Sequence, residues 1–288
     1  MWVIANGAPK SGSTWIFQLI RETRSFSPLP KAFQDQDWNN QSVDTALLKD
    51  AIEILPAQAE NFATKQHWPS PAPLFEKEAD SKGLLLGPYR RVKQQFSLAQ
   101  QARLQGRLLS TPGIKICNII RDIRDVVVSL YHHQVRLSRF HGDIESFLRC
   151  NGDLVIRSTV DYHHYWMHAP RRSPINYFVT AYEYLSEDTP AAAGALFDFL
   201  QLELSEETRD HAVEATKFDA KKSTGPGMFF RKGRPFAFDD DLDADQAGWI
   251  LEAAKRRGLG EVKRAIAEFN PTLGPYLEVT DVGLGRSS

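Results

Sequence analysis

The sequence predicts an α/β fold of three layers, in which a central parallel sheet is flanked by helices. Short apolar segments of strand character occur at residues 2–5, 114–120 and 177–182, and each leads into a segment with helical spacing of its apolar residues. Strands that alternate with helices form parallel sheets, because each parallel connection needs a crossover element. Ligands bind beyond the carboxyl ends of such strands, which is where the polar motifs of this chain fall.

The first strand leads into a glycine-containing loop. Residues 7–14 read Gly-Ala-Pro-Lys-Ser-Gly-Ser-Thr, and a helical pattern opens at Thr14, with one apolar face formed by Trp15, Ile16, Leu19 and Ile20. Backbone N–H groups of such a loop, with a helix N-terminus behind them, bind phosphate oxygens. The spacing is close to that of a Walker A loop, but Ser13 stands at the lysine position and the lysine is Lys10. An ordinary tight turn between strand and helix is the alternative.

The second strand, residues 114–120, ends at Arg121, and Ser129 follows eight residues later in the next expected helix. An arginine fork and a nearby hydroxyl suit a phosphate group. Taken alone, however, the Arg121-Asp122 and Arg124-Asp125 pairs favour a surface cluster of ion pairs. The third strand ends at Tyr182-Glu183 and leads into a helix expected near residues 191–200.

The remaining segments are less regular. Residues 69–113 begin in a proline-rich loop and show a weak pattern, with some helical periodicity from 89 to 109. The C-terminal part holds a glycine-rich loop at 223–233 and a helix expected at 245–257. Acidic residues before that helix have the spacing of a calcium loop, but Gln246 stands where such a loop needs glycine, so we interpret them as helix caps. No repeat or linker divides the chain, and we expect one domain over residues 1–288.

Three of these motifs together resemble sulfotransferases that use 3′-phosphoadenosine 5′-phosphosulfate (PAPS), a family of cytosolic type. Residues 9–15 are similar to the family's 5′-phosphosulfate loop, residues 115–129 to its strand–Arg–helix–Ser element, and residues 229–233 to its C-terminal Arg-Lys-Gly loop. The resemblance covers nearly the whole chain and is weakest over 69–113. It implies a fold like that of P-loop-containing nucleotide hydrolases and PAPS as the sulfuryl donor. The family's Gly-Asp-Trp-Lys continuation is absent here, since the chain reads Arg-Pro-Phe-Ala-Phe at 234–238.

The resemblance also implies roles for particular residues. Residues 62–69 are similar to the family's Lys-Thr-His-Leu-Pro segment, so His67 is implied as the catalytic base and Lys65 as an assisting cation. Lys10 and Ser129 complete the implied catalytic set. The implied nucleotide-binding residues are Lys10, Ser11, Gly12, Ser13, Thr14, Trp15, Arg121, Ser129, Tyr182, Thr216, Phe218, Phe230, Arg231, Lys232 and Gly233.

Composition excludes several other classes. The chain has 42% hydrophobic and 25% charged residues, as in globular proteins, and 35 basic residues are balanced by 36 acidic ones. Nucleic-acid binders are normally clearly basic, so we expect no such partner. No stretch approaches 18 apolar residues, so we expect no membrane span. Two cysteines and the lack of a signal-peptide pattern favour a cytoplasmic protein without a disulfide framework.

Three functions are compatible with these motifs. The first is sulfuryl transfer from PAPS to the hydroxyl group of a small-molecule acceptor, without a metal. The second is a P-loop nucleotide kinase, which the displaced lysine and the missing acidic partner disfavour. The third is a nucleotide-binding module without turnover. His164 and His168 could chelate a metal, but no third ligand has suitable spacing, so we expect packing or acceptor-pocket roles for them.

The acceptor is not readable from the sequence. Residues 25–38, 69–113 and 141–167 are expected to cover the acceptor pocket, with 69–113 as a candidate lid. Their aromatic residues, among them Tyr162 and Trp166, favour an apolar acceptor, whereas Arg90, Arg91, Arg171 and Arg172 favour an anionic one.

Overall fold

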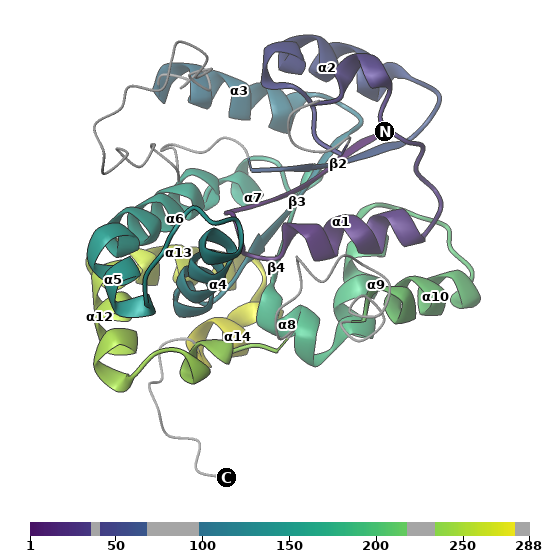
Figure 1. The fold of residues 1–288 in the computed structure, drawn as a ribbon. Coiled ribbons are helices and arrows are strands. Elements are labelled where there is room, and N and C mark those ends of the chain that lie inside the picture. Colours follow the sequence, from purple (N-terminus) through teal and green to yellow (C-terminus); the bar gives the residue numbers. More distant parts are fainter. Residues whose placement is uncertain (36–40, 68–97, 218–233, 280–288) are drawn as a thin grey trace.

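The structure is a computed structural model that describes residues 1–35, 41–67, 98–217 and 234–279. Its centre is a parallel sheet of four strands in the order β2-β1-β3-β4 (Figure 1). The strands are β1 (Trp2–Gly7), β2 (Phe62–Gln66), β3 (Ile114–Ile120) and β4 (Tyr177–Ala181). The predicted class, a parallel sheet flanked by helices, is confirmed.

Helices cover both faces of this sheet. In Figure 1, α2 and α3 lie on one side of it, and α1, α9 and α10 lie on the other. The helices in chain order are α1 (Ser13–Glu22), α2 (Leu48–Ile54), α3 (Leu98–Ser110), α4 (Ile123–Arg136), α5 (Ile144–Phe147), α6 (Asp153–Trp166), α7 (Ala169–Arg172), α8 (Tyr182–Glu187), α9 (Thr189–Phe199), α10 (Glu206–Thr216), α12 (Ala244–Arg256), α13 (Leu259–Phe269) and α14 (Gly274–Val279).

Alternate residues of each strand enter different cores because strand side chains point to opposite faces. Trp2 and Ile4 of β1 pack into the core beneath α2, α3 and α6, whereas Val3 and Ala5 pack against α1 and α9. Burial on both faces explains why the central strands are continuous apolar runs rather than alternating ones.

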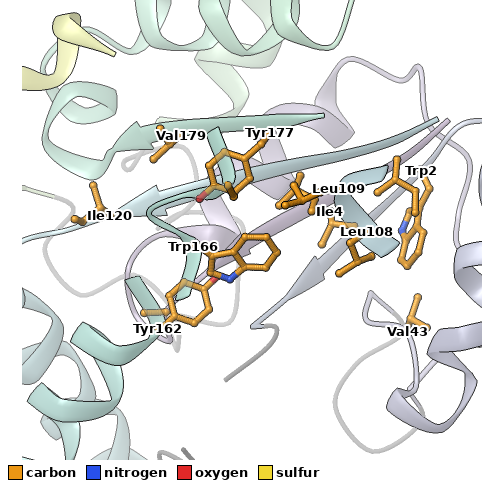
Figure 2. Close-up of a cluster of buried hydrophobic side chains, with 14 of the residues drawn as sticks. Trp2, Ile4, Val43, Leu108, Leu109, Ile120, Tyr162, Trp166, Tyr177 and Val179 are labelled. Atoms are coloured by element: carbon orange, nitrogen blue, oxygen red, sulfur yellow. The ribbon is translucent and has the colours of Figure 1, made fainter. Parts of the chain in front are cut away.

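One expectation about the acceptor pocket is wrong. Tyr162 and Trp166 are each 1% exposed and belong to the main core, where the Trp166 ring stacks on Tyr177 with centroids 5.6 Å apart (Figure 2). The Tyr162 hydroxyl donates to Oδ1 of Asn118, and the Asn118 amide donates to the Tyr177 hydroxyl. A satisfied polar network of this kind holds a core together. These aromatic rings are therefore packing residues and do not line an acceptor pocket.

The acidic segment before α12 is a helix cap, as the sequence predicts. Asp243 accepts a hydrogen bond from the backbone N–H of Gln246, and Oε1 of the Gln246 side chain accepts one from the Asp243 N–H. This capping box satisfies two N–H groups that a helix start leaves without partners. The residue that departs from the calcium-loop pattern, Gln246, is thus the one that completes the cap.

The histidines and cysteines considered as metal ligands or disulfide partners have other surroundings. The His164 ring nitrogen Nε2 lies 3.0 Å from the Arg257 carbonyl oxygen, which agrees with a packing role. Among the described residues, no group of three or more potential metal ligands is found, and none of the helices has the length and apolar character to cross a membrane. Both cysteines are free thiols, with Cys117 buried and Cys150 exposed.

Candidate functional site

The loop between β1 and α1 is closed by its own hydrogen bonds. The backbone N–H and the hydroxyl of Ser11 both donate to the Ala8 carbonyl, at 3.0 and 2.6 Å. Gly12 has φ 112°, and a Cβ there would lie 2.8 Å from Cδ2 of Tyr182, so only glycine fits. The helix α1 begins at Ser13 and directs its first N–H groups toward the loop. This arrangement suits the oxygens of a phosphate group.

Lys10 stands at the tip of this loop with a left-handed backbone, φ 72°. Burial, followed by the positive charges of Arg136, Arg121 and Lys65, lowers the pKa of Lys10 to about 8. Three further cations therefore act on Lys10, and a cluster of positive charge is a favourable place for an anion.

Lys65 and His67 approach the same loop from β2. Lys65 pairs in register with Ala5 of β1, and its Nζ donates to the Thr14 hydroxyl at 3.5 Å. His67 follows the strand, and its Nδ1 lies 2.8 Å from the Gly7 carbonyl oxygen. The parallel pairing of β2 with β1 thus brings together three residues that the resemblance implies as catalytic, Lys10, Lys65 and His67.

Arg121, directly after β3, is held on several sides. One terminal nitrogen donates to the Lys10 carbonyl at 3.3 Å, and the other lies 3.4 Å from a carboxylate oxygen of Asp125. The guanidinium carbon lies 4.0 Å above the centre of the Tyr182 ring. Its Nε is buried and has no hydrogen-bond partner among the described residues. A buried donor without a partner is costly, and an anion is the ligand that would satisfy it.

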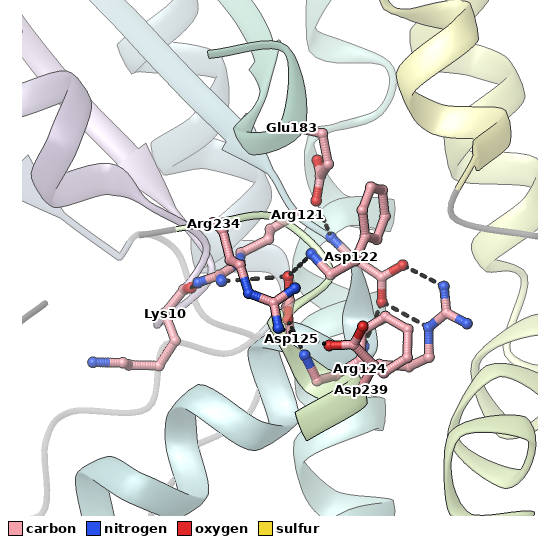
Figure 3. A network of polar contacts seen from close by, with 10 residues as sticks. Lys10, Arg121, Asp122, Arg124, Asp125, Glu183, Arg234 and Asp239 are labelled. Carbon is pink, nitrogen blue, oxygen red and sulfur yellow. Dashed lines mark hydrogen bonds and ion pairs between the residues drawn. The ribbon is translucent and has the colours of Figure 1, made fainter. Parts of the chain in front are cut away.

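The prediction of a surface ion-pair cluster is wrong. Arg121 pairs with Asp125 and Arg124 pairs with Asp122 (Figure 3), and these side chains are largely buried. The side chains of Arg124 and Asp122 are 3% and 0% exposed, and the guanidinium contacts both carboxylate oxygens. The Asp122 N–H donates to the Glu183 carboxylate at 2.9 Å, and burial raises the pKa of Glu183 to about 7. The sequence shows the charges but not their burial.

The other predicted nucleotide-binding residues lie on α1, α4, α8 and α10 or outside the described residues. The rings of Trp15 and Tyr182 meet edge to face with centroids 5.5 Å apart. Ser129 lies on α4 two helical turns beyond Arg121, and Thr216 is buried at the end of α10, where its hydroxyl donates to the Ala212 carbonyl. Outside the described residues lie Phe218, Phe230, Arg231, Lys232 and Gly233.

His133 lies in the helix after Ser129, and from that position the sequence indicates that it could line the pocket. Burial and the charges of Lys10, Arg136, Arg139 and Lys65 lower the pKa of His133 to about 4. Its Nδ1 is buried and has no hydrogen-bond partner among the described residues. The signal in the sequence was helical spacing, since residue 133 follows Ser129 by four positions on α4.

A family model and a curated protein that match this chain both belong to the sulfotransferases. The chain matches the family model described as "Sulfotransferase domain" over residues 2–250. It is 30% identical to bovine Sulfotransferase 1A1 over 138 residues, which are 46% of this chain and 44% of that protein. The aligned part thus spans less than half of this curated relative.

Solved structures share the fold. The crystal structure of mouse sulfotransferase SULT7A1 complexed with PAP superposes with a TM-score of 0.59 at 18% identity, covering 97% of this chain and 88% of that one. Retinol dehydratase in complex with androsterone and inactive cofactor PAP gives a TM-score of 0.57 at 18% identity, covering 89% and 80% of the two chains. At this level of identity the likeness concerns the fold.

Proposed function

The chain belongs to the sulfotransferase domain family, and on this premise we propose that it transfers the sulfuryl group of PAPS to the hydroxyl group of a small molecule. The product of the donor is adenosine 3′,5′-bisphosphate (PAP). The observation that carries the proposal is the approach of Lys10, Lys65 and His67 to one phosphate-type loop. The PAP held by both structural relatives supports the same nucleotide for this chain.

The residues present fit the nucleotide. Its 5′-phosphosulfate would meet the N–H groups of the loop together with Lys10, Ser11, Gly12, Ser13 and Thr14. Its 3′-phosphate would meet Arg121, whose buried Nε has no partner among the described residues, and Ser129 on the following helix, α4. Trp15, Tyr182, Thr216 and Phe218 would surround the adenine, and Phe230, Arg231, Lys232 and Gly233 would complete the 3′-phosphate site.

The chemistry follows from these positions. When bound, PAPS would supply the sulfuryl group, and its 5′-phosphate oxygen would leave the sulfur as the acceptor oxygen attacks in line. His67 takes the proton of the acceptor hydroxyl at Nε2, since its Nδ1 is bound to the Gly7 carbonyl. Lys10, assisted by Lys65, stabilises the negative charge that collects on the departing phosphate oxygen. Ser129 assists by holding the nucleotide in place for this step.

The kinase alternative lacks a free carboxylate where magnesium would need one. Arg121 stands directly after β3, where a kinase would need a carboxylate, and both oxygens of the next residue, Asp122, accept hydrogen bonds from Arg124. A carboxylate already paired in a buried salt bridge is a poor metal ligand, because removing it would leave Arg124 buried without its partner. This contact favours sulfuryl transfer over phosphoryl transfer.

The proposal is tested by isothermal titration of PAP, AMP and ATP against the protein without magnesium. We expect PAP to bind at least about 10-fold more tightly than AMP, because charge-assisted contacts to the 3′-phosphate are lost in AMP. Transfer from PAPS to a panel of phenols and alcohols then tests turnover. Equal binding of PAP and AMP would reject the proposed nucleotide, and PAP binding without any transfer would favour the non-catalytic module.

A further inference from the structure

We propose that Asp125 is a positioning residue that gives the nucleotide site its preference for a 3′-phosphate. It does so by orienting Arg121 and by holding the chain segment at residues 236–238 beside it. This inference rests on the proposed function, since it assumes that Arg121 binds the 3′-phosphate of PAP.

The Asp125 carboxylate binds Arg121, four residues before it, and two backbone N–H groups that lie 111 and 113 residues further along the chain. Its Oδ2 lies 3.4 Å from the Arg121 guanidinium and accepts a hydrogen bond from the Phe236 N–H at 2.8 Å. Its Oδ1 accepts a hydrogen bond from the Phe238 N–H at 2.9 Å. The side chain is 1% exposed, so water does not weaken these contacts. The carboxylate therefore joins β3, α4 and the short 3-10 helix at Ala237–Asp240.

These contacts leave part of the Arg121 fork for a ligand. Asp125 and the Lys10 carbonyl take one donor from each terminal nitrogen, and Tyr182 covers one face of the guanidinium. The buried Nε and the remaining terminal N–H groups are not used by these contacts. A guanidinium fixed before the ligand arrives loses less side-chain entropy on binding. Asp125 is thus the carboxylate that keeps Arg121 in a binding orientation.

The backbone at Phe236 supports this role. Phe236 has φ 56°, in the left-handed region that bulky residues rarely adopt. A residue in a strained backbone conformation persists only where its surroundings hold it. The hydrogen bond from the Phe236 N–H to Asp125 is one contact that holds Phe236. Residue 236 comes three positions after Gly233, the last of the residues that would complete the 3′-phosphate site in the proposed function. Through one carboxylate, Asp125 therefore holds both Arg121 and the backbone at residues 236–238.

Asp122 offers a matched control. It is 1% exposed, compared with 2% for Asp125, and it also forms a buried ion pair next to the same strand. Its partner, however, is Arg124 and not Arg121. Replacing either aspartate by asparagine removes one buried charge without changing the shape of the side chain. Only the Asp125 change alters the partner of Arg121.

The test measures the PAP and AMP affinities of the full chain by isothermal titration. In Asp125→Asn we expect PAP to bind about 10- to 100-fold more weakly while AMP changes by less than about 3-fold, because the lost coupling acts through the 3′-phosphate contact. Asp122→Asn should keep the wild-type ratio of the two affinities. In Arg121→Gln the preference for PAP over AMP should be lost. The double variant that adds Asp125→Asn should bind PAP less than about 3-fold more weakly than Arg121→Gln alone.

Several results would overturn the inference. They are an unchanged ratio in Asp125→Asn, an equal loss for PAP and AMP, or the same loss of ratio in Asp122→Asn. If Asp125→Asn does not fold, Asp125→Glu keeps the charge at a changed distance, and an unchanged ratio in that variant would count against the inference too. A wild-type protein without preference for PAP would instead reject the proposed function itself, and this inference with it.

Discussion

At the scale of single residues, the contact between His67 and Gly7 decides which ring nitrogen can act as a base. A carbonyl oxygen only accepts, so Nδ1 of His67 carries the proton and donates it to Gly7 across 2.8 Å. In the neutral ring Nε2 then holds the lone pair, as a general base requires. The backbone of the phosphate-type loop thereby sets the protonation pattern of the histidine next to it.

Removing this base should affect turnover far more than binding. In His67→Ala we expect kcat to fall by about 10²- to 10⁴-fold, with the Kd of PAP nearly unchanged. His164 is a matched control, because its ring also contacts a backbone carbonyl, that of Arg257, outside the proposed site. His164→Ala should cost stability but keep kcat. Full activity of His67→Ala would remove His67 from the mechanism.

Lys10 should make nucleotide binding depend on pH. Its pKa is lowered to about 8, so the free protein loses this positive charge as the pH rises through 8. Binding of an anion favours the charged form, so PAP should bind with uptake of a proton and with falling affinity between pH 7 and 9. Titrations in two buffers of different ionisation enthalpy measure that uptake, and Lys10→Met should abolish it. A Kd that stays constant over this range would contradict the assignment.

At the scale of elements, the sequence predicts the strands that are mainly apolar and misses the polar one. The predicted strands at 2–5, 114–120 and 177–182 correspond to β1, β3 and β4. The strand β2 is missed because Thr64, Lys65 and Gln66 do not have the pattern of a buried strand. Their partners come from other parts of the chain, namely the Trp2 indole, the Thr14 hydroxyl and the Val43 carbonyl.

Local sequence patterns also predict only part of the candidate site. The loop at 7–14 could be predicted to join a strand to a helix, and Arg121 and Ser129 to follow β3 and to lie in the next helix, because each motif is contiguous. The burial of Asp122 and Asp125 could not be predicted from local charges. Asp125 binds N–H groups 111 and 113 residues away, and a local pattern carries no information about such contacts. Charged residues are normally exposed, which made the surface interpretation the natural one.

The capping box of α12 allows a test confined to one element. Asp243→Ala removes the side chain that binds the Gln246 N–H, and we expect a loss of about 1 kcal/mol in the free energy of unfolding. PAP affinity should not change, because the cap lies outside the proposed site. Chemical denaturation measures the loss, with exposed Glu206→Ala, inside the first turn of α10, as a control of smaller effect. Stabilisation of the wild type by calcium would instead favour the calcium-loop interpretation.

At the scale of the whole molecule, the candidate site depends on elements spread along the chain. The loop after β1, the residue after β2, the end of β3 and the start of α8 all contribute, and Asp125 adds the segment near residue 237. Helices α13 and α14 pack through Val262 and Leu277 into the same core as Trp2 of β1. Parts near both ends of the described chain thus share one core, which supports the prediction of a single domain.

Nucleotide binding should therefore stabilise the chain as one cooperative unit. A ligand that binds only the folded state at about 100 times its Kd adds roughly 2.7 kcal/mol, which for a chain of this size raises Tm by roughly 5 °C. We expect one unfolding transition in calorimetry, shifted upward by PAP and much less by AMP at the same concentration, because AMP lacks the group that Arg121 is proposed to bind. Two transitions, of which PAP moves only one, would show that part of the chain unfolds independently of the site and would contradict the single-domain prediction.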